Sequence, residues 1–177
     1  MAARFEVVLV RHGETEWTKT GQHTSRTDLP LTATGEHQAR QLGAELAGRP
    51  FAVILTSPLR RAWQTAELTG FGAAERVDDL RELDYVDYEG RTTAEIRREV
   101  PDWTIFAGGA PGGETAEEVA ARADRLIARA ADRTDDAVRA FTRVRELDPA
   151  DVGAAINLGQ LLVQQRRFDE AIKLLRP

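Results

Sequence analysis

Three side chains in the first part of the chain could together bind a phosphoryl group. Arg11 and His12 follow a short apolar run at residues 5–10, and Arg61 comes soon after a second apolar run at residues 52–55. If both runs are parallel strands, their carboxyl ends lie at the edge of the sheet where open α/β sheets bind ligands. Two guanidinium groups beside an imidazole suit phosphate, because arginine binds its oxygens in pairs and stabilises the charge that spreads over them during transfer. The sequence therefore predicts one anion site made by Arg11, His12 and Arg61.

Alternating strand and helix signals describe the elements that would position these groups. The apolar runs 5–10 and 52–55 have the composition and length of buried parallel strands. Thr32 and Ser57 are suitable N-caps, and Pro58 suits a first helical turn. Helices are accordingly predicted over residues 33–46, 58–68 and 117–131. This alternation favours an α/β sandwich.

The surrounding sequence distinguishes this site from a chance tripeptide. Arg-His-Gly alone is a weak signal, and a lone histidine near a strand end is more often structural. Here four ordered motifs occur: RHGETEW at 11–17 with GQHTSRTDLPLT at 21–32, TSPLRRAWQTA at 56–66, LRELDYVDYEG at 80–90, and PGGET at 111–115. They closely resemble the motifs of the histidine phosphatase superfamily, also called phosphoglycerate mutase-like. The resemblance implies a three-layer α/β sandwich.

The resemblance also implies a role for each site residue. His12 would attack phosphorus and form a phosphohistidine, which divides a difficult transfer into two easier steps. Arg11 and Arg61 would hold the phosphoryl oxygens. Glu82 would protonate the leaving alcohol and then deprotonate the attacking water. The positions expected to contact substrate are Thr18, Thr24 and Arg26.

The two remaining histidines carry weaker expectations. His37 is expected on the exposed side of the helix at 33–46, whereas His23 lies in a loop and could contact substrate. Neither stands at a metal-ligand spacing from His12, so no metal or other cofactor is expected.

The overall composition excludes several kinds of partner. The net charge of -5 argues against nucleic acid and anionic membranes, because both favour a basic surface. The chain has no cysteine, which excludes disulfides and thiolate chemistry. No apolar run is long enough to cross a membrane, so we expect a cytoplasmic protein that binds a small phosphorylated substrate.

The sequence changes character near Asp132. Residues 135–139, DDAVR, match residues 169–173, DEAIK, at a spacing typical of helical repeats. The segment 132–177 resembles half of one tetratricopeptide unit followed by most of a second. Because such units bury their faces by stacking, and about three or more are usually needed, a short pair cannot stand alone. A helical hairpin packed on the rest of the chain and a surface for a protein partner both stay open.

The resemblance to the phosphatase family stops near Ala131. That family has a later strand ending in a second histidine beside the first, whereas no histidine follows His37 in this chain. We therefore expect an incomplete phosphoglycerate mutase-like sandwich over residues 1–131, with an α-helical repeat-like segment at 132–177. The first strand would keep an unpaired edge. A fusion, a recombined chain and a misread frame would each explain the join.

These observations predict a phosphomonoester hydrolase that acts through His12. Its activity should be impaired, because the loss of one charge-stabilising donor typically costs about 10²- to 10³-fold in rate. The alternative is a chain without catalytic activity, either a phosphate-binding protein or an interaction module that acts through its helical repeats.

Overall fold

A computed structural model describes residues 7–49, 51–147 and 152–175 of the chain, which form a mixed α/β fold. The chain divides into two compact units, and each is described by itself. The first unit comprises Arg11–Ala47 and Ile54–Leu126. The second comprises Met1–Val10, Gly48–Val53 and Ile127–Pro177.

The sheet of the first unit is small and parallel. Strand β1, Leu55–Thr56, pairs with strand β2, Glu75–Arg76, so that Leu55 lies opposite Glu75 and Thr56 opposite Arg76. Helix α3, Arg60–Leu68, connects the two strands and completes one β-α-β unit. The prediction of a strand over residues 52–55 was therefore wrong in its bounds. The carbonyl oxygens of Ile54 and Thr56 accept backbone hydrogen bonds from Glu75 and Val77, at 3.0 Å and 2.8 Å.

The first predicted strand is absent from the residues that the structure describes. Residues 7–10 form no strand, and all four side chains are exposed, Leu9 by 89%. Residues 5 and 6 lie outside the described part of the chain. A central strand needs hydrogen-bonded neighbours, because its backbone groups are otherwise left without partners. Where the sequence analysis expected a later strand after Ala131, the described residues continue as helix to Leu147.

The helices of the first unit confirm one predicted cap and correct another. In α2, Ala33–Leu46, the side chain of Thr32 accepts the N–H of Gly35, as expected for an N-cap. Helix α3 begins two residues later than predicted, at Arg60. The side chain of Asp28, from a distant loop, accepts the Arg60 N–H at 2.5 Å and takes the place of the predicted Ser57 cap.

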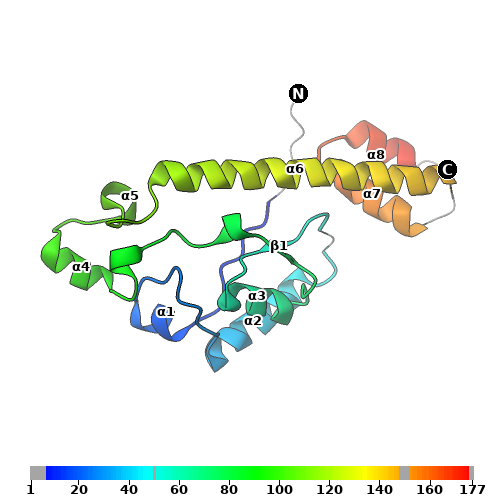
Figure 1. The fold of residues 1–177 in the computed structure, drawn as a ribbon. Coiled ribbons are helices and arrows are strands. Elements are labelled where there is room, and N and C mark those ends of the chain that lie inside the picture. The colour runs from blue at the N-terminus through cyan, green and yellow to red at the C-terminus, as the bar shows by residue number, and fades with distance from the viewer. Residues whose placement is uncertain (1–6, 50, 148–151, 176–177) are drawn as a thin grey trace. The chain divides into compact units, whose positions relative to one another are not determined.

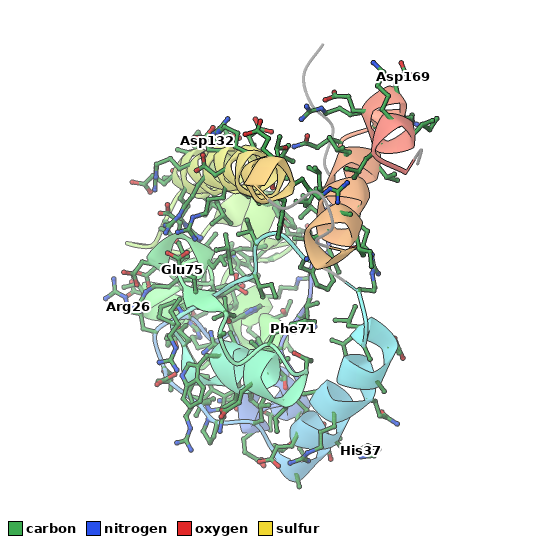
Figure 2. The ribbon with its side chains drawn as sticks, turned by 90° about the vertical axis from the view of Figure 1, so that its right-hand side faces the viewer. Arg26, His37, Phe71, Glu75, Asp132 and Asp169 are labelled. Carbon is green, nitrogen blue, oxygen red and sulfur yellow. The ribbon has the colours of Figure 1, made fainter. Side chains whose placement is uncertain are left out.

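Further short elements complete the first unit. They are α1, Glu16–Thr20; α4, Thr93–Glu99; α5, Ile105–Gly108; and the 3-10 turns η1, Asp78–Leu80, and η2, Val86–Tyr88. Its apolar core gathers Tyr85, Tyr88, Ile96 and Trp103. His37 is exposed on α2, as predicted (Figure 2).

Helix α6, Ala116–Leu147, runs without a break through the predicted end at residue 131 (Figure 1). Residues 116–147 contain neither glycine nor proline, so nothing in the local sequence stops the helix there. The prediction that this helix ends at Ala131 was therefore wrong. The helix passes from the first unit into the second.

The second unit is a small helical assembly. The C-terminal half of α6 is joined by α7, Val152–Gln164, and α8, Phe168–Leu175. Their shared core consists of Val138, Leu158, Leu161, Leu162 and Ala171. Small residues at 137 and 171 pack in or against this core, which matches the repeat-like pattern of the sequence. No helix within the described ranges is both long and apolar enough to span a membrane.

Candidate active site

The loop that carries His12 is fixed by glycine backbone on one helix and a threonine on another. The N–H of Gly13 donates to the Thr65 hydroxyl on α3 at 3.1 Å, and this hydroxyl donates to the Arg61 carbonyl at 2.8 Å. A Cβ on Gly13 would lie 2.3 Å from the Gly35 carbonyl oxygen at the start of α2. Glycine is therefore required at position 13, and α2 and α3 together place His12.

The imidazole of His12 is half-buried and has a defined tautomer. Its Nδ1 lies 2.8 Å from the Gly13 carbonyl oxygen. Because a carbonyl can only accept, Nδ1 carries the hydrogen of the neutral ring and Nε2 carries the lone pair. Burial lowers the pKa of His12, and the charges of Arg61 and Arg11 lower it further, against the Gly13 hydrogen bond and the Glu82 carboxylate. The neutral, nucleophilic form of the ring is thereby favoured.

Arg61 lies buried in the first turn of α3, with 3% of its surface exposed. Its guanidinium donates to three carbonyl oxygens of one loop: those of Thr27 at 3.0 Å, Ser25 at 3.2 Å and Thr24 at 3.3 Å. Burial lowers the pKa of Arg61, while carboxylates led by Glu82 raise it. A guanidinium has five N–H donors. Among the described residues the Nε–H and one Nη1–H form no such bond.

The same loop is held by a carboxylate that the sequence analysis did not single out. Glu89 accepts the backbone N–H of Ser25 at 2.8 Å and that of Thr27 at 3.0 Å, as well as the Ser25 hydroxyl. Burial raises the pKa of Glu89, but these hydrogen bonds outweigh it and the pKa falls below its usual range. Glu89 lies within the motif at residues 80–90. The sequence analysis could not assign its role, because the backbone N–H groups that it binds are present in every residue except proline.

The charge of Glu82 acts on side chains from several segments of the chain. Its carboxylate is exposed, and Oε1 accepts the N–H of Leu83 at 2.9 Å. Its negative charge raises the pKa of four side chains from different segments: His12, His23, Arg61 and Tyr85. Burial is the main reason why the pKa of Tyr85 rises to about 12. The exposed Arg11 belongs to the same neighbourhood, since its charge lowers the pKa of both His12 and Tyr85. The charges of Arg11, Arg61 and Glu82 all act on the His12 ring.

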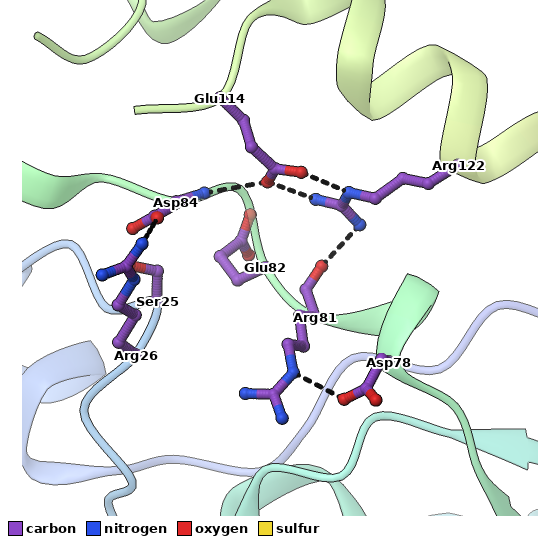
Figure 3. Close-up of a pocket in the computed structure, with 8 residues that line it drawn as sticks. All are labelled: Ser25, Arg26, Asp78, Arg81, Glu82, Asp84, Glu114 and Arg122. Atoms are coloured by element: carbon purple, nitrogen blue, oxygen red, sulfur yellow. Dashed lines mark hydrogen bonds and ion pairs between the residues drawn. The ribbon is translucent and has the colours of Figure 1, made fainter. Parts of the chain in front are cut away.

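A cavity of about 460 Å³ opens beside Glu82 (Figure 3). Its lining is Ser25, Arg26, Asp78, Arg81, Glu82, Asp84, Glu114 and Arg122. Figure 3 shows the Glu82 carboxylate between the Arg26–Asp84 pair and the Glu114–Arg122 pair. His12, Arg11 and Arg61 are not among the residues that line this cavity.

The three predicted substrate contacts are placed differently. Arg26 is largely exposed, forms an ion pair with Asp84 and lines the cavity. The Thr24 hydroxyl donates to the Gln22 carbonyl at 3.3 Å. The Thr18 hydroxyl accepts the Thr15 N–H at 2.7 Å and closes the capping box of α1. Of the three, only Arg26 lies at the cavity.

His23 belongs to an aromatic cluster next to the site. Its ring stacks on Tyr85 with centroids 4.7 Å apart and meets the edge of Trp103 at 5.3 Å. Its Nε2 lies 3.1 Å from the Thr93 hydroxyl. Burial lowers the pKa of His23, opposed by Glu82. These contacts give His23 a packing role that the sequence did not indicate.

Comparison with known families gives two matches along the chain. Residues 7–143 match the Histidine phosphatase superfamily (branch 1), and residues 128–177 match the Tetratricopeptide repeat. The two matches overlap within α6. Both segments agree with those predicted from the sequence motifs.

Similar proteins include phosphatases of known name. An acid phosphatase of Mycobacterium tuberculosis is 42% identical over 125 residues, which are 69% of this chain and 61% of that protein. Sedoheptulose 1,7-bisphosphatase of Saccharomyces cerevisiae is 40% identical over 147 residues, covering 69% of this chain and 54% of the yeast protein. The chain thus spans little more than half the length of these relatives.

A solved structure confirms the predicted fold class. The structure of an open reading frame from Mycobacterium tuberculosis superimposes with a TM-score of 0.63 at 41% identity, covering 66% of this chain and 62% of that one.

Proposed function

Since the chain belongs to the histidine phosphatase superfamily, we propose that it hydrolyses small phosphate monoesters through a phosphohistidine formed on His12. The observation that carries this proposal is the tautomer of His12, with Nδ1–H bonded to the Gly13 carbonyl and Nε2 left as the nucleophile. The lowered pKa of His12 supports the same role.

In the first step, His12 Nε2 attacks phosphorus and the bond from phosphorus to the alcohol oxygen breaks. Glu82 gives its proton to that oxygen, so a neutral alcohol leaves. Arg61 and Arg11 stabilise the charge on the phosphoryl oxygens.

In the second step, water attacks the phosphohistidine. Glu82, now a carboxylate, accepts the proton of that water. The N–P bond breaks, which releases phosphate and restores neutral His12.

We propose that turnover is slow. No histidine follows residue 37, so this chain contains no later histidine of the kind that the family places beside the first. Loss of one charge-stabilising donor typically costs about 10²- to 10³-fold.

The substrate proposal draws on the relatives. One is named for acid phosphatase activity and another for a sugar bisphosphate. Both names support a small phosphorylated substrate for the cavity beside Glu82. Substrate contact by Thr18, Thr24 and Arg26 is part of the same proposal, and Arg26 is the best placed of them.

The division of the chain is also a proposal. We assign residues 1–131 to the phosphatase-like part and 132–177 to the repeat-like helices. The start of the repeat match at residue 128 supports this division, although α6 is continuous across it.

The test is hydrolysis of p-nitrophenyl phosphate by the full chain and by His12→Ala. We expect slow release by the wild-type chain, none above background by the variant, and acid-labile phosphate bound to the wild-type protein after rapid quenching. Equal rates for the two proteins would refute the proposal.

A second candidate is phosphate binding without turnover. It is favoured by the absence of a later histidine together with the retention of Arg11, His12 and Arg61. It predicts that millimolar phosphate stabilises the wild-type chain against heat with no hydrolysis. The repeat-like helices would then recruit a protein partner, as their match to the Tetratricopeptide repeat suggests.

A further inference from the structure

One ion pair beside the site joins α6 to the PGGET loop. Arg122 Nε donates to Glu114 Oε1 and Arg122 Nη2 to Glu114 Oε2, each at 2.9 Å. Both side chains are largely shielded, with 13% of Arg122 and 27% of Glu114 exposed. Two parallel bonds of this kind fix the orientation of a guanidinium as well as its position.

The same ion pair holds the segment that carries Glu82. Arg122 Nη1 donates to the carbonyl oxygens of Asp79 at 2.8 Å and Arg81 at 2.7 Å. Glu114 Oε2 accepts the backbone N–H of Asp84 at 3.1 Å. The backbone is therefore tied on both sides of Glu82, once at residue 81 and once at residue 84 (Figure 3).

Glycine allows this close approach. A Cβ on Gly113 would lie 2.1 Å from the Asp84 carbonyl oxygen, and the Glu114 N–H donates to the same oxygen at 3.3 Å. The PGGET loop thus lies directly against the segment after Glu82.

The Glu82 side chain itself has one hydrogen bond among the described residues. Residues 81–84 belong to no helix or strand, and the hydrogen bond of the Glu82 side chain goes to its neighbour Leu83. The position of an exposed carboxylate on an irregular segment depends on how firmly the backbone of that segment is fixed. Displacing a catalytic group by about 1 Å can cost about 10²-fold in rate.

We propose that Arg122, through its ion pair with Glu114, is a positioning residue for Glu82. The proposal rests on the function proposed above, in which Glu82 is the general acid. In this role Arg122 acts through the backbone of residues 79–84 and not on the reacting atoms. It determines the position from which the Glu82 carboxyl group donates its proton to the leaving oxygen.

This role makes a prediction that general loss of structure does not share. An alkyl alcohol leaves only with a proton, whereas p-nitrophenolate leaves readily as an anion, so the second substrate depends little on the general acid. A misplaced Glu82 should therefore slow an alkyl phosphate far more than p-nitrophenyl phosphate.

The experiment compares both substrates in the full chain. For Arg122→Ala and Glu114→Gln we expect kcat/KM for glycerol 2-phosphate to fall about 10- to 100-fold, with a change of about 3-fold or less for p-nitrophenyl phosphate. The matched control is Arg125→Ala, one turn further along α6. Arg125 pairs with the Asp79 side chain at 2.8 Å but donates to neither of the carbonyl oxygens, at residues 79 and 81, that accept from Arg122. The Arg125→Ala substitution should leave kcat/KM unchanged for both substrates.

Hydrogen exchange gives a readout that does not need turnover. Peptides covering residues 79–84 should exchange faster in Arg122→Ala and Glu114→Gln, while Arg125→Ala should retain the protection of the Asp84 amide. The proposal would be overturned if kcat/KM fell equally for the two substrates. It would also be overturned if hydrogen exchange of residues 79–84 were unchanged in the Arg122 and Glu114 variants. If the wild-type chain and His12→Ala hydrolyse neither substrate, the proposed function fails, and the exchange result still decides whether Arg122 holds the segment.

Discussion

The Glu89 carboxylate accepts the backbone N–H of Ser25 at 2.8 Å, 64 residues earlier in the chain. The carbonyl oxygen of Ser25 accepts a hydrogen bond from Arg61 at 3.2 Å. One loop residue is therefore held through its donor by an anion and through its acceptor by a cation. This arrangement fixes the backbone of the loop.

The Glu89→Gln substitution should destabilise the first unit. A neutral amide weakens the bonds from Ser25 and Thr27, and hydrogen bonds to charged groups contribute about 2 kcal/mol each. We expect the free energy of unfolding to fall by about 2 kcal/mol, measured by urea denaturation followed by tryptophan fluorescence. The matched control is Glu99→Gln, which removes a surface ion pair with Arg91 and should leave the free energy of unfolding almost unchanged. Equal effects would contradict this account.

Acid should remove the same contribution from the wild-type chain. Because the pKa of Glu89 is lowered in the folded state, its carboxylate stabilises the fold above the ordinary pKa of 4.5. That contribution is lost as the pH falls through the folded-state pKa. The gap in urea midpoint between the wild-type chain and Glu89→Gln should therefore close in acid. A gap that is independent of pH would show that the charge of Glu89 does not matter.

Local signals in the sequence predicted local features correctly. The Thr32 cap depends only on residues within one helical turn, and it is present. The predicted convergence of Arg11, His12 and Arg61 rested on one rule about the ends of parallel strands, and it stays a prediction. The first of those strands is absent over residues 7–10, and Thr65 and Gly35 contact the His12 loop from two helices.

Features that depend on distant partners were not predictable in the same way. The start of α3 is set by Asp28, which lies more than thirty residues earlier, and not by its neighbour Ser57. Arg61 and Glu89 hold the loop at residues 24–27 mainly through its backbone N–H and carbonyl groups. Every residue type except proline has both groups, so the sequence of the loop does not reveal the contact. The predicted end of α6 was wrong because it was placed where the resemblance to the phosphatase family stops, near Ala131. The residues that follow still favour helix, and the helix continues to Leu147.

The Gly13→Ala substitution should disrupt the site through sterics alone. Its Cβ would lie 2.3 Å from the Gly35 carbonyl oxygen, and backbone cannot move aside as a side chain can. We expect a loss of about 3 kcal/mol in unfolding free energy, as for overpacking, together with loss of phosphate-induced stabilisation. The control is Gly72→Ala, whose Cβ would meet the Glu67 side chain at an ordinary 3.7 Å. A Gly13→Ala protein as stable as Gly72→Ala would refute the packing argument.

The charges around His12 should act on its ring with opposite signs. The wild-type ring should titrate below 6.5, because burial and the charges of Arg61 and Arg11 oppose protonation. The Arg11→Met substitution removes a positive charge, so the pKa of His12 should rise. Glu82→Gln removes a negative charge, so that pKa should fall further.

Proton NMR of the three histidines across the pH range can measure both shifts, with His12 assigned from its disappearance in His12→Ala. Shifts of the same sign in Arg11→Met and Glu82→Gln would mean that the substitutions act by rearranging the loop. Opposite signs require both charges to face one imidazole, and a phosphoryl group bound to that imidazole would meet an arginine and a proton donor together.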